Sequence, residues 1–391
     1  MMSLPDSSSP GAGKALRGLR VLEFSAGSVA GQYGGQCLGD LGADVVRVDG
    51  AWTAGAACHA AFNRNKRSLS ADPHTGEGRE LLRRLCGRAD VLIDALPAAT
   101  LDGLGLGWPE LSRAAPRLVY ARVVPAVMPA GPAPQDAADL LAEAAGGYMG
   151  ITGGRDGAPS RLGTSALEAL AGVNCQSAIL AALFQRAATG LGQHVSTSVL
   201  ESEIAFLANA AVECLLGGPQ PARWGSEHAQ QVPYKAFRTA DGWIVVAAGF
   251  QNLYAAFVQE LGRPDLAADA RFATMSGRVQ NRAALYAALD AETARHGTGD
   301  LLRRLERSGV PCAPVNDLAQ VFAHRQVRHR GMRVDLPGGR PGARAVLGPP
   351  ARYSAFAVAE DWMAPPTAGE HTESVLQDWL APADQVAPLV P

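Results

Sequence analysis

Leu19-Arg-Val-Leu-Glu-Phe24 opens the structured part of the sequence, and Val45-Val-Arg-Val-Asp49 follows a Gly- and Ala-rich stretch from Ser25 to Leu41. The two apolar segments have the pattern of strands, and the stretch between them has the length of a helix. A strand, a helix and a second strand within about 30 residues predict a right-handed crossover between parallel strands.

The same alternation continues along the chain. Thr75 to Arg88 has the apolar spacing of an amphipathic helix, and strands are expected at Val91-Leu-Ile-Asp94 and Leu118-Val-Tyr-Ala-Arg-Val123. A helix is expected from Asp136 to Ala145, and a long apolar helix, buried on most sides, from Ser165 to Ala188. Strands that alternate with helices predict an α/β fold, with a large, doubly wound, Rossmann-like domain.

The composition also suggests how the chain is divided. Its predicted parts are a flexible tail (1–15), the first part of the large α/β domain (16–216), a polar linker (217–232), a smaller α+β domain (233–330) and a C-terminal segment (331–391). The tail lacks the apolar run of a signal peptide. The C-terminal segment is expected to contain one helix, at about 370–380.

The overall composition excludes several classes of protein. Apolar residues make up 47% and charged residues 18%, with a net charge of −2, so the chain is globular and has no basic field for nucleic acid. No uninterrupted apolar run is long enough to predict a membrane span. The six cysteines form no CxxC pair and the eight histidines show no ligand spacing beside them, so we expect no metal and reduced thiols in the cytoplasm.

The first strand is followed by a turn, Ser25-Ala-Gly-Ser-Val-Ala-Gly31, that precedes the first helix. A Gly-rich turn lets phosphate approach a helix N-terminus closely. The glycine spacing is not G-x-G-x-x-G, so the dinucleotide fingerprint fails, although Asp49 ends the second strand where an acidic residue would bind ribose. A tight turn without any ligand is an equal alternative.

Asn63-Arg-Asn-Lys-Arg-Ser68 places three cations within four residues. Such a cluster can hold a pyrophosphate or a 3′-phosphate. The alternative is a solvated basic loop, which the residues alone favour.

Glu168 is the carboxylate of interest, because it lies in the first turn of the long apolar helix. There the positive end of the helix dipole favours its ionised form, which can attack a thioester carbonyl and form a mixed anhydride. Ser165-x-x-Glu168 also has the spacing of a capping box, a purely structural role that the spacing favours. No G-x-S-x-G motif occurs, and Cys175 lies within a helix, as buried structural thiols do.

The order of several motifs resembles family III of the CoA-transferases, the formyl-CoA transferase type, whose relatives include the α-methylacyl-CoA racemases. The segments that carry the resemblance are Leu16 to Phe24, Leu38 to Asp49, Phe62-Asn-Arg-Asn-Lys-Arg-Ser68, Ala89 to Ile93, Ile179-Leu-Ala-Ala-Leu183, Thr189 to Gln193, Asp241-Gly-Trp-Ile244, Gly309 to Val315 and Gly369-Glu-His-Thr372. They cover nearly the whole length.

The resemblance implies an enzyme that moves CoA between carboxylic acids, with acyl-CoA and an acid as substrates. It implies that the C-terminal segment returns to the large domain and that two subunits interlock as a homodimer. Counting back from Ile179 places the family's nucleophile at Glu168. The resemblance places CoA-binding positions at Ala26, Gly27, Ala30, Arg64, Asn65, Lys66, Leu96 and Pro97, and substrate loops at Asp136 and Tyr148.

The chain also departs from the family pattern. The nucleophile is Glu instead of Asp. Relatives carry a polar segment that contacts CoA after their third strand, and in this chain Ala95-Leu-Pro-Ala-Ala-Thr100 stands in its place. Gln135 stands where the racemases have His. Other functions therefore stay open: epimerisation, acyl transfer to an acceptor other than CoA, or a non-catalytic homologue in which Glu168 only caps the helix. A nicotinamide-dependent dehydrogenase is the least favoured of these alternatives.

Overall fold

The computed structural model describes residues 14–50, 59–124, 138–336, 345–358 and 362–380. The chain divides into two compact units. The first comprises Met1–Tyr148, Leu162–Pro219 and Gln326–Pro391, and the second comprises Met149–Arg161 and Gln220–Arg325. Each unit has a hydrophobic core of its own.

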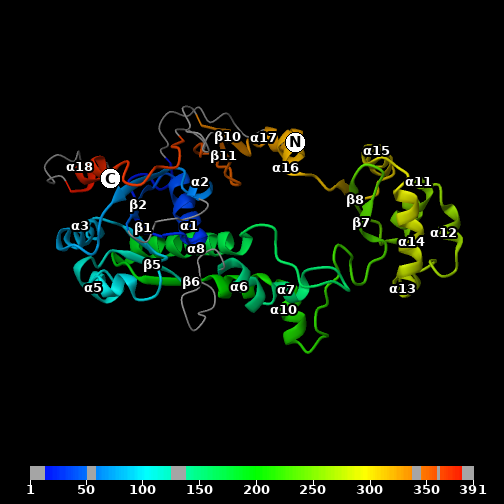
Figure 1. Cartoon of the computed structure of the whole chain (residues 1–391), viewed down its shortest axis with the longest axis horizontal. Coiled ribbons are helices and arrows are strands. Elements are labelled where there is room, and N and C mark those ends of the chain that lie inside the picture. Colours follow the sequence, from blue (N-terminus) through cyan, green and yellow to red (C-terminus); the bar gives the residue numbers. More distant parts are fainter. Residues whose placement is uncertain (1–13, 51–58, 125–137, 337–344, 359–361, 381–391) are drawn as a thin grey trace. The chain divides into compact units, whose positions relative to one another are not determined.

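The first unit is built on a six-stranded sheet with the strand order β3-β2-β1-β4-β5-β6 (Figure 1). Every neighbouring pair is parallel. The strands are β1 (Arg20–Phe24), β2 (Asp44–Asp49), β3 (Lys66–Ser70), β4 (Val91–Asp94), β5 (Val119–Val124) and β6 (His194–Ser198). This order is that of a doubly wound Rossmann sheet, so the α/β prediction is confirmed.

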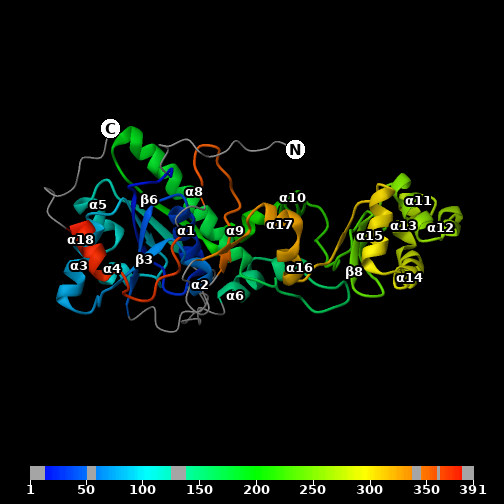
Figure 2. The ribbon, with the colours of Figure 1, turned by 90° about the horizontal axis from the view of Figure 1, so that it is seen from above.

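Helices cover both faces of this sheet (Figure 2). The helices α1 (Val29–Asp40) and α8 (Ala166–Thr189) share one core with Val21, Val91 and Ile93. The opposite face carries α3 (Gly76–Cys86), α5 (Trp108–Ala114) and α18 (Thr372–Leu380). Successive strand residues point to opposite faces, so both sets must be apolar, which explains the nearly continuous apolar strands.

Two glycines allow α1 and α8 to pack closely. A methyl group on Gly172 would lie 2.7 Å from the carbonyl oxygen of Ala30, and one on Gly34 would lie 3.2 Å from the carbonyl oxygen of Gly172. Any larger side chain at Gly172 would therefore push the helices apart. The Gly- and Ala-rich composition of α1 follows from this packing.

The C-terminal segment packs along the edge of the sheet that ends in β3. Trp379 Nε1 donates a hydrogen bond of 2.7 Å to Asp44 Oδ2, and Arg67 pairs with both Asp44 and Asp378. The backbone N–H of Gly369 donates to Ser68 Oγ at 2.7 Å. Residues 362–380 thus belong to the first unit although they follow the second in sequence.

The second unit contains a three-stranded antiparallel sheet of β7 (Tyr234–Arg238), β8 (Trp243–Ala247) and β9 (Cys312–Pro314). The fully buried Arg278 donates hydrogen bonds to the carbonyl oxygens of Val232, Gly249 and Phe272, and so ties three loops together. The helices of the second unit are α11 (Gln251–Glu260), α12 (Pro264–Ala268), α13 (Met275–Gln280), α14 (Arg282–Thr293), α15 (Thr298–Arg307) and α16 (Leu318–Ala323).

Residues 149–161, which the sequence analysis placed in the large domain, group with the second unit. The N–H of Gly225 donates to the carbonyl of Gly153, Arg223 donates to that of Gly157, and the Arg155 guanidinium lies over the Trp224 ring. These contacts explain the grouping.

The remaining elements are short. They are α2 (His59–Phe62), α4 (Thr100–Gly103), α6 (Ala138–Ala145), α7 (Tyr148–Ile151), α9 (Val199–Phe206), α10 (Ala208–Leu215), α17 (Arg325–His329), β10 (Arg333–Asp335) and β11 (Ala345–Leu347). Within the described residues, α8 is the one helix long and apolar enough to cross a membrane, a property that core helices of globular proteins share. Its packing against α1 and the sheet buries one face of α8. Val173 and Phe184 on the same helix are exposed, so the expectation that it is buried on most sides is wrong.

We predict that Gly172→Ala destabilises the first unit by about 1–3 kcal/mol, because the added methyl group overpacks the contact with Ala30. Gly76→Ala is the control, since a methyl group there meets nothing within 4 Å. Urea unfolding checks both variants. Equal stability of Gly172→Ala and wild type would contradict the role assigned to the close contact.

Candidate active site around Glu168

Glu168 lies where the N-termini of α1 and α8 meet. The N–H of Val29, the first residue of α1, donates a hydrogen bond of 3.2 Å to Glu168 Oε2. The N-cap of α8, Ser165, makes no side-chain capping bond. The capping-box alternative is therefore wrong: the carboxylate bonds to another helix, 139 residues away in sequence.

Two opposing effects set the ionisation of Glu168. Its side chain is buried, and burial together with the nearby charge of Asp139 raises its pKa to about 7, while the hydrogen bond from the Val29 N–H lowers it. The first turn of a helix also favours negative charge. The carboxylate therefore changes its ionisation near neutral pH and, once ionised, is more basic than an ordinary glutamate.

The predicted CoA-binding positions in the first turn surround this point. Ala26 has a left-handed backbone, with φ of 45°, and its carbonyl accepts a hydrogen bond from Gln32 Nε2 at 2.7 Å. Gly27 follows it, and Ala30 is buried against Gly172. A methyl group on Gly31 would lie 2.6 Å from Ala95 Cβ, so the turn packs tightly against the segment after β4.

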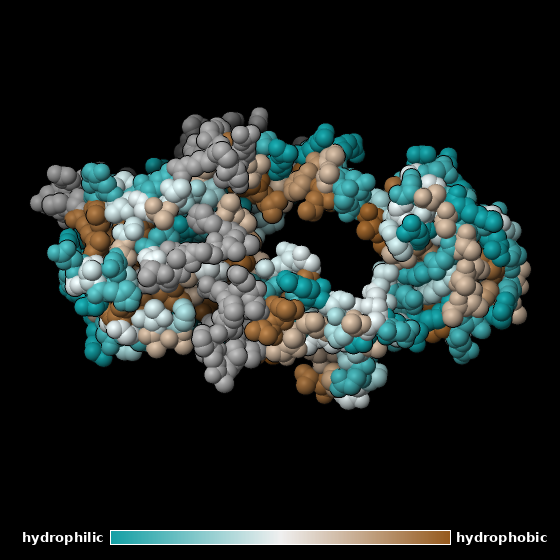
Figure 3. Space-filling model, viewed as in Figure 1, coloured by the Kyte–Doolittle hydropathy of each residue, from teal (hydrophilic) through white to brown (hydrophobic). Residues whose placement is uncertain are grey.

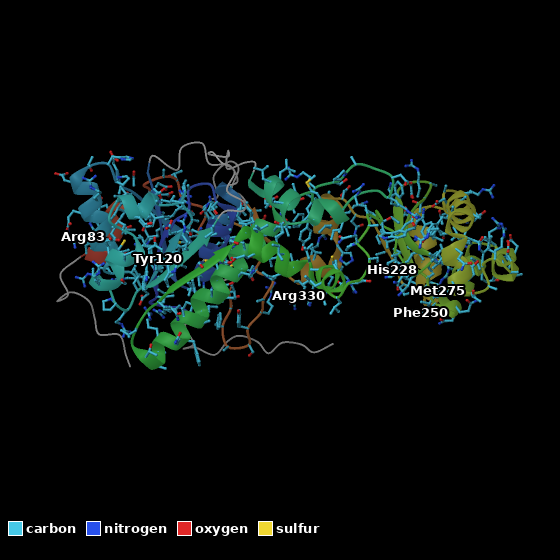
Figure 4. All side chains as sticks on the ribbon, turned by 90° about the horizontal axis from the view of Figure 1, so that it is seen from below. Arg83, Tyr120, His228, Phe250, Met275 and Arg330 are labelled. Atoms are coloured by element: carbon cyan, nitrogen blue, oxygen red, sulfur yellow. The ribbon has the colours of Figure 1, made fainter. Side chains whose placement is uncertain are left out.

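Leu96 and Pro97 lie in that neighbouring segment. Leu96 is buried and Pro97 is exposed. Asp94 Oδ1 accepts the Leu96 N–H at 3.2 Å, and Asp94 Oδ2 accepts the hydroxyl of Tyr120, which is labelled in Figure 4, at 2.8 Å. The structure thus brings the two predicted segments together at the carboxyl ends of β1 and β4, where ligands bind in open α/β sheets. Contact with CoA stays a prediction.

The cationic cluster is buried rather than solvated. Lys66 Nζ pairs with Glu23 Oε2 at 2.7 Å, and both side chains are fully buried. It also donates to the carbonyl of Gln32 and to Asn63 Oδ1. Burial lowers the pKa of Lys66, and Glu23 opposes this effect. The alternative of a solvated loop is wrong for Lys66.

Arg64 and Asn65, which precede Lys66, also have hydrogen-bond partners within the protein. Arg64 forms two hydrogen bonds to Asp40, of 3.0 and 2.6 Å, and its guanidinium lies over the ring of Trp362. Asn65 Nδ2 donates to Asp40 Oδ1, and Asn65 Oδ1 accepts the Met363 N–H. Arg64 and Asn65 thus connect α1 to the C-terminal segment, whereas Lys66 bonds to β1 and α1. The binding of CoA by all three residues stays a prediction.

The two substrate-loop positions have different outcomes. Asp136 lies outside the described residues. Tyr148, which begins α7, is half-buried, and burial together with the charge of Glu203 raises its pKa. The sequence analysis missed Asp139 on α6, whose charge acts on Glu168. Acidic residues one turn apart, Asp139 and Glu143, within an otherwise apolar helix are the signal that could have found it.

Ribose binding, a cysteine nucleophile and metal binding have little support among the described residues. Asp49 is bound by Arg47 and Ser68, so its carboxylate is not free for a ribose. Burial raises the pKa of Cys86 and Cys175 to about 12, so neither is a thiolate at neutral pH. Among these residues no three His, Cys, Asp or Glu side chains gather to hold a metal ion.

Comparisons with known proteins identify the family to which the chain is similar. The sequence profile of CoA-transferase family III matches residues 16–372. The chain is 34% identical to the succinyl-CoA:glutarate CoA-transferase of Mus musculus, over 94% of this chain and 87% of that protein. It is 33% identical to the succinate–glutarate CoA-transferase of Agrobacterium fabrum, over 97% and 98%. The crystal structure of a CAIB/BAIF family protein from Brucella suis matches with a TM-score of 0.84 at 35% identity, over 93% and 99%.

We predict that Lys66→Met lowers the free energy of unfolding by about 3–5 kcal/mol, because it leaves the buried Glu23 carboxylate without its partner. The double variant Lys66→Met/Glu23→Gln should recover part of this loss. Arg83→Met is the control, since Arg83 is 57% exposed and pairs only with Glu80 on the surface. If Lys66→Met left stability unchanged and weakened only CoA binding, Lys66 would be a ligand-binding residue rather than a structural one.

Proposed function

Because the chain belongs to CoA-transferase family III, we propose that it moves CoA between carboxylic acids with Glu168 as the nucleophile. The observation that carries the proposal is the placement of one buried carboxylate at the meeting point of two helix N-termini, beside the switch point of the sheet. The named relatives that act on succinyl-CoA and glutarate make small dicarboxylic acids the first substrates to test.

The chemistry of exchange requires a nucleophile that is itself an acid. An oxygen of ionised Glu168 attacks the thioester carbonyl, the carbon–sulfur bond breaks, and CoA leaves as the thiolate. The thiolate then attacks the Glu168 carbonyl of the mixed anhydride and releases the donor acid, so that Glu168 carries CoA as a thioester. The acceptor carboxylate reverses these steps and regenerates Glu168. No proton is consumed, and each negative charge that appears replaces another.

The local geometry favours these steps. The Val29 N–H and the first turn of α1 stabilise negative charge on the Glu168 oxygens when the anhydride is broken. The raised pKa makes the ionised oxygen a stronger nucleophile. The methylene by which Glu exceeds Asp helps the carboxylate to reach Val29 across the contact between α1 and α8.

We predict that Glu168→Gln lowers the transfer rate by about a thousandfold or more, because the amide cannot form the anhydride. Glu168→Asp should lower it by roughly a hundredfold through displacement of the oxygen. Transfer by the wild type should rise with pH through about 7, where Glu168 ionises. Rates come from acyl-CoA donors incubated with a panel of acids.

Trapping tests the intermediate directly. Hydroxylamine should convert the activated glutamate to a hydroxamate, detected by mass spectrometry on the peptide that contains residue 168. Labelling should require an acyl-CoA and be absent from Glu168→Gln. An enzyme that transfers CoA without labelling, and keeps its rate in Glu168→Gln, would exclude this mechanism. An enzyme that binds CoA but shows no transfer with any donor would support a non-catalytic homologue.

We also propose that a second copy of the chain covers one face of the first unit. Exposed apolar side chains gather on three consecutive helices, and the end of α10 forms an apolar patch in Figure 3. They are Val173 and Phe184 on α8, Ile204 and Phe206 on α9, and Val212 and Leu215 on α10, with Leu216 next to it. Exposed large apolar side chains on neighbouring helices are typical of an obligate interface, and the interlocked homodimer remains the expected assembly.

We predict that Phe184→Glu lowers the fraction of dimer recovered after unfolding and refolding, measured by size-exclusion chromatography with light scattering, because Phe184 is 84% exposed on α8. Phe250→Glu is the matched control, since Phe250 is 62% exposed but lies in the second unit. Circular dichroism checks that both variants fold. A wild type that is monomeric at micromolar concentration would contradict the proposal.

A further inference from the structure

Three carboxylates are buried on α6 and α9, two helices that both contact α8, the helix that carries Glu168. Asp139 and Glu143 lie one turn apart on α6, and Glu203 lies on α9, which packs against α6. We call these three side chains the carboxylate cluster. Their exposed fractions are 5%, 0% and 0%, values that acidic residues reach rarely unless they are paired.

Glu143 and Glu203 have few partners for their charge. The Leu162 N–H donates to Glu143 Oε2 at 2.8 Å. Among the residues that the structure describes, neither Glu143 Oε1 nor either oxygen of Glu203 has a hydrogen-bond partner, and no Lys or Arg pairs with either residue. An ionised carboxylate that is buried without any partner is strongly unfavourable, so Glu203 gains by keeping a proton.

The backbone closes over Glu203. A methyl group on Gly146 would lie 2.5 Å from both Cδ and Oε2 of Glu203, so a larger residue there would displace the carboxyl group. Gly146 follows the last turn of α6 and precedes Tyr148. The chain therefore packs directly on the carboxyl group and keeps water from solvating its charge.

We propose that Glu203 keeps a proton at neutral pH, and that the negative charge thereby withheld from the carboxylate cluster would otherwise oppose the ionisation of Glu168. Glu203 is then a positioning residue that sets the ionisation of the nucleophile without touching the substrate. The part of the proposal that concerns Glu168 rests on the proposed function, whereas the protonation of Glu203 does not.

The charges around the cluster agree with this assignment. Burial, followed by the charges of Glu143 and Asp139, raises the pKa of Glu203 to about 7. The groups that face Glu203 are Glu143 and Asp139 on α6 and Tyr148 on α7, and none of them is a cation. Asp139 also raises the pKa of Glu168 on α8. It is thus the one carboxylate that acts on both glutamates.

The sign of the pH effect follows from this arrangement. In the unfolded chain Glu203 ionises near 4.5, whereas in the folded protein it keeps its proton to about 7. Stability is therefore lost as the pH rises through this window. When the proton leaves, the added negative charge also opposes the ionisation of Glu168, so the two groups titrate together.

The first test needs no substrate. Infrared difference spectra of Glu168→Gln, in which the nucleophile no longer titrates, should show the C=O stretch of a buried carboxylic acid between about pH 6 and pH 8. The double variant Glu168→Gln/Glu203→Gln should lose this band. The melting temperature of Glu203→Gln should exceed that of wild type by a few degrees near pH 8, and the difference should shrink toward about pH 5. Glu201→Gln, an exposed glutamate on the same helix, is the control.

The second test uses transfer activity. Glu203→Gln should shift the acid limb of the pH–rate profile by about half a pH unit or more to lower pH, because the amide never adds a charge to the cluster. Glu201→Gln should leave the profile in place. The proposal is overturned if Glu168→Gln/Glu203→Gln keeps the infrared band of Glu168→Gln and Glu203→Gln has the same stability profile as wild type. If the wild type transferred no CoA at all, the proposed function would fail, while the infrared and melting data would still decide whether Glu203 keeps its proton.

Discussion

The close contact of α1 with α8 determines where the chemistry can take place. Gly34 and Gly172 allow the two helix backbones to approach until the carbonyl of Ala30 lies where a side chain of residue 172 would begin. At this separation Glu168, near the start of α8, reaches the first N–H of α1. Both helices pack on the same face of the sheet, so the contact also fixes Glu168 relative to the ends of β1 and β4. A small change in the distance between the helices would separate the carboxylate from the turn that precedes α1.

A second constraint lies beneath that turn. Glu23 on β1 pairs with Lys66 on β3, and its Oε1 accepts a hydrogen bond of 2.6 Å from Ser25. Gly35 leaves room for this pair, because a methyl group there would lie 1.9 Å from Glu23 Oε2. A buried ion pair adds little net stability compared with apolar residues, but it tolerates only one arrangement of its hydrogen bonds. It therefore specifies the register of β1, α1 and β3 around the turn.

Local patterns predicted much of the fold, because strands and helices in a doubly wound sheet are set by short-range periodicity. The strand β6 was missed, since His194-Val-Ser-Thr-Ser198 is polar and forms an edge of the sheet. The geometry of the site was harder to predict, because the residues that form hydrogen bonds and ion pairs there are far apart in sequence. The spacing of Ser165 and Glu168 is that of a cap, yet the true partner of Glu168 is Val29. Likewise, nothing near Arg64 or Lys66 in the sequence indicates that Asp40 and Glu23 neutralise them.

A nucleophilic carboxylate must satisfy two opposing requirements. A high pKa makes the ionised oxygen more reactive, but it reduces the fraction that is ionised at a given pH. Burial and Asp139 act in the first direction on Glu168, while the Val29 N–H and the helix N-termini act in the second. These effects place the pKa at about 7, where a large share of the molecules is ionised and the oxygen is more basic than that of a solvated glutamate. An exposed carboxylate would be fully ionised but weakly nucleophilic, and one buried without the α1 N-terminus would keep its proton. The placement of Glu168 between a helix N-terminus and a neighbouring acid is thus a way to obtain both properties from one side chain.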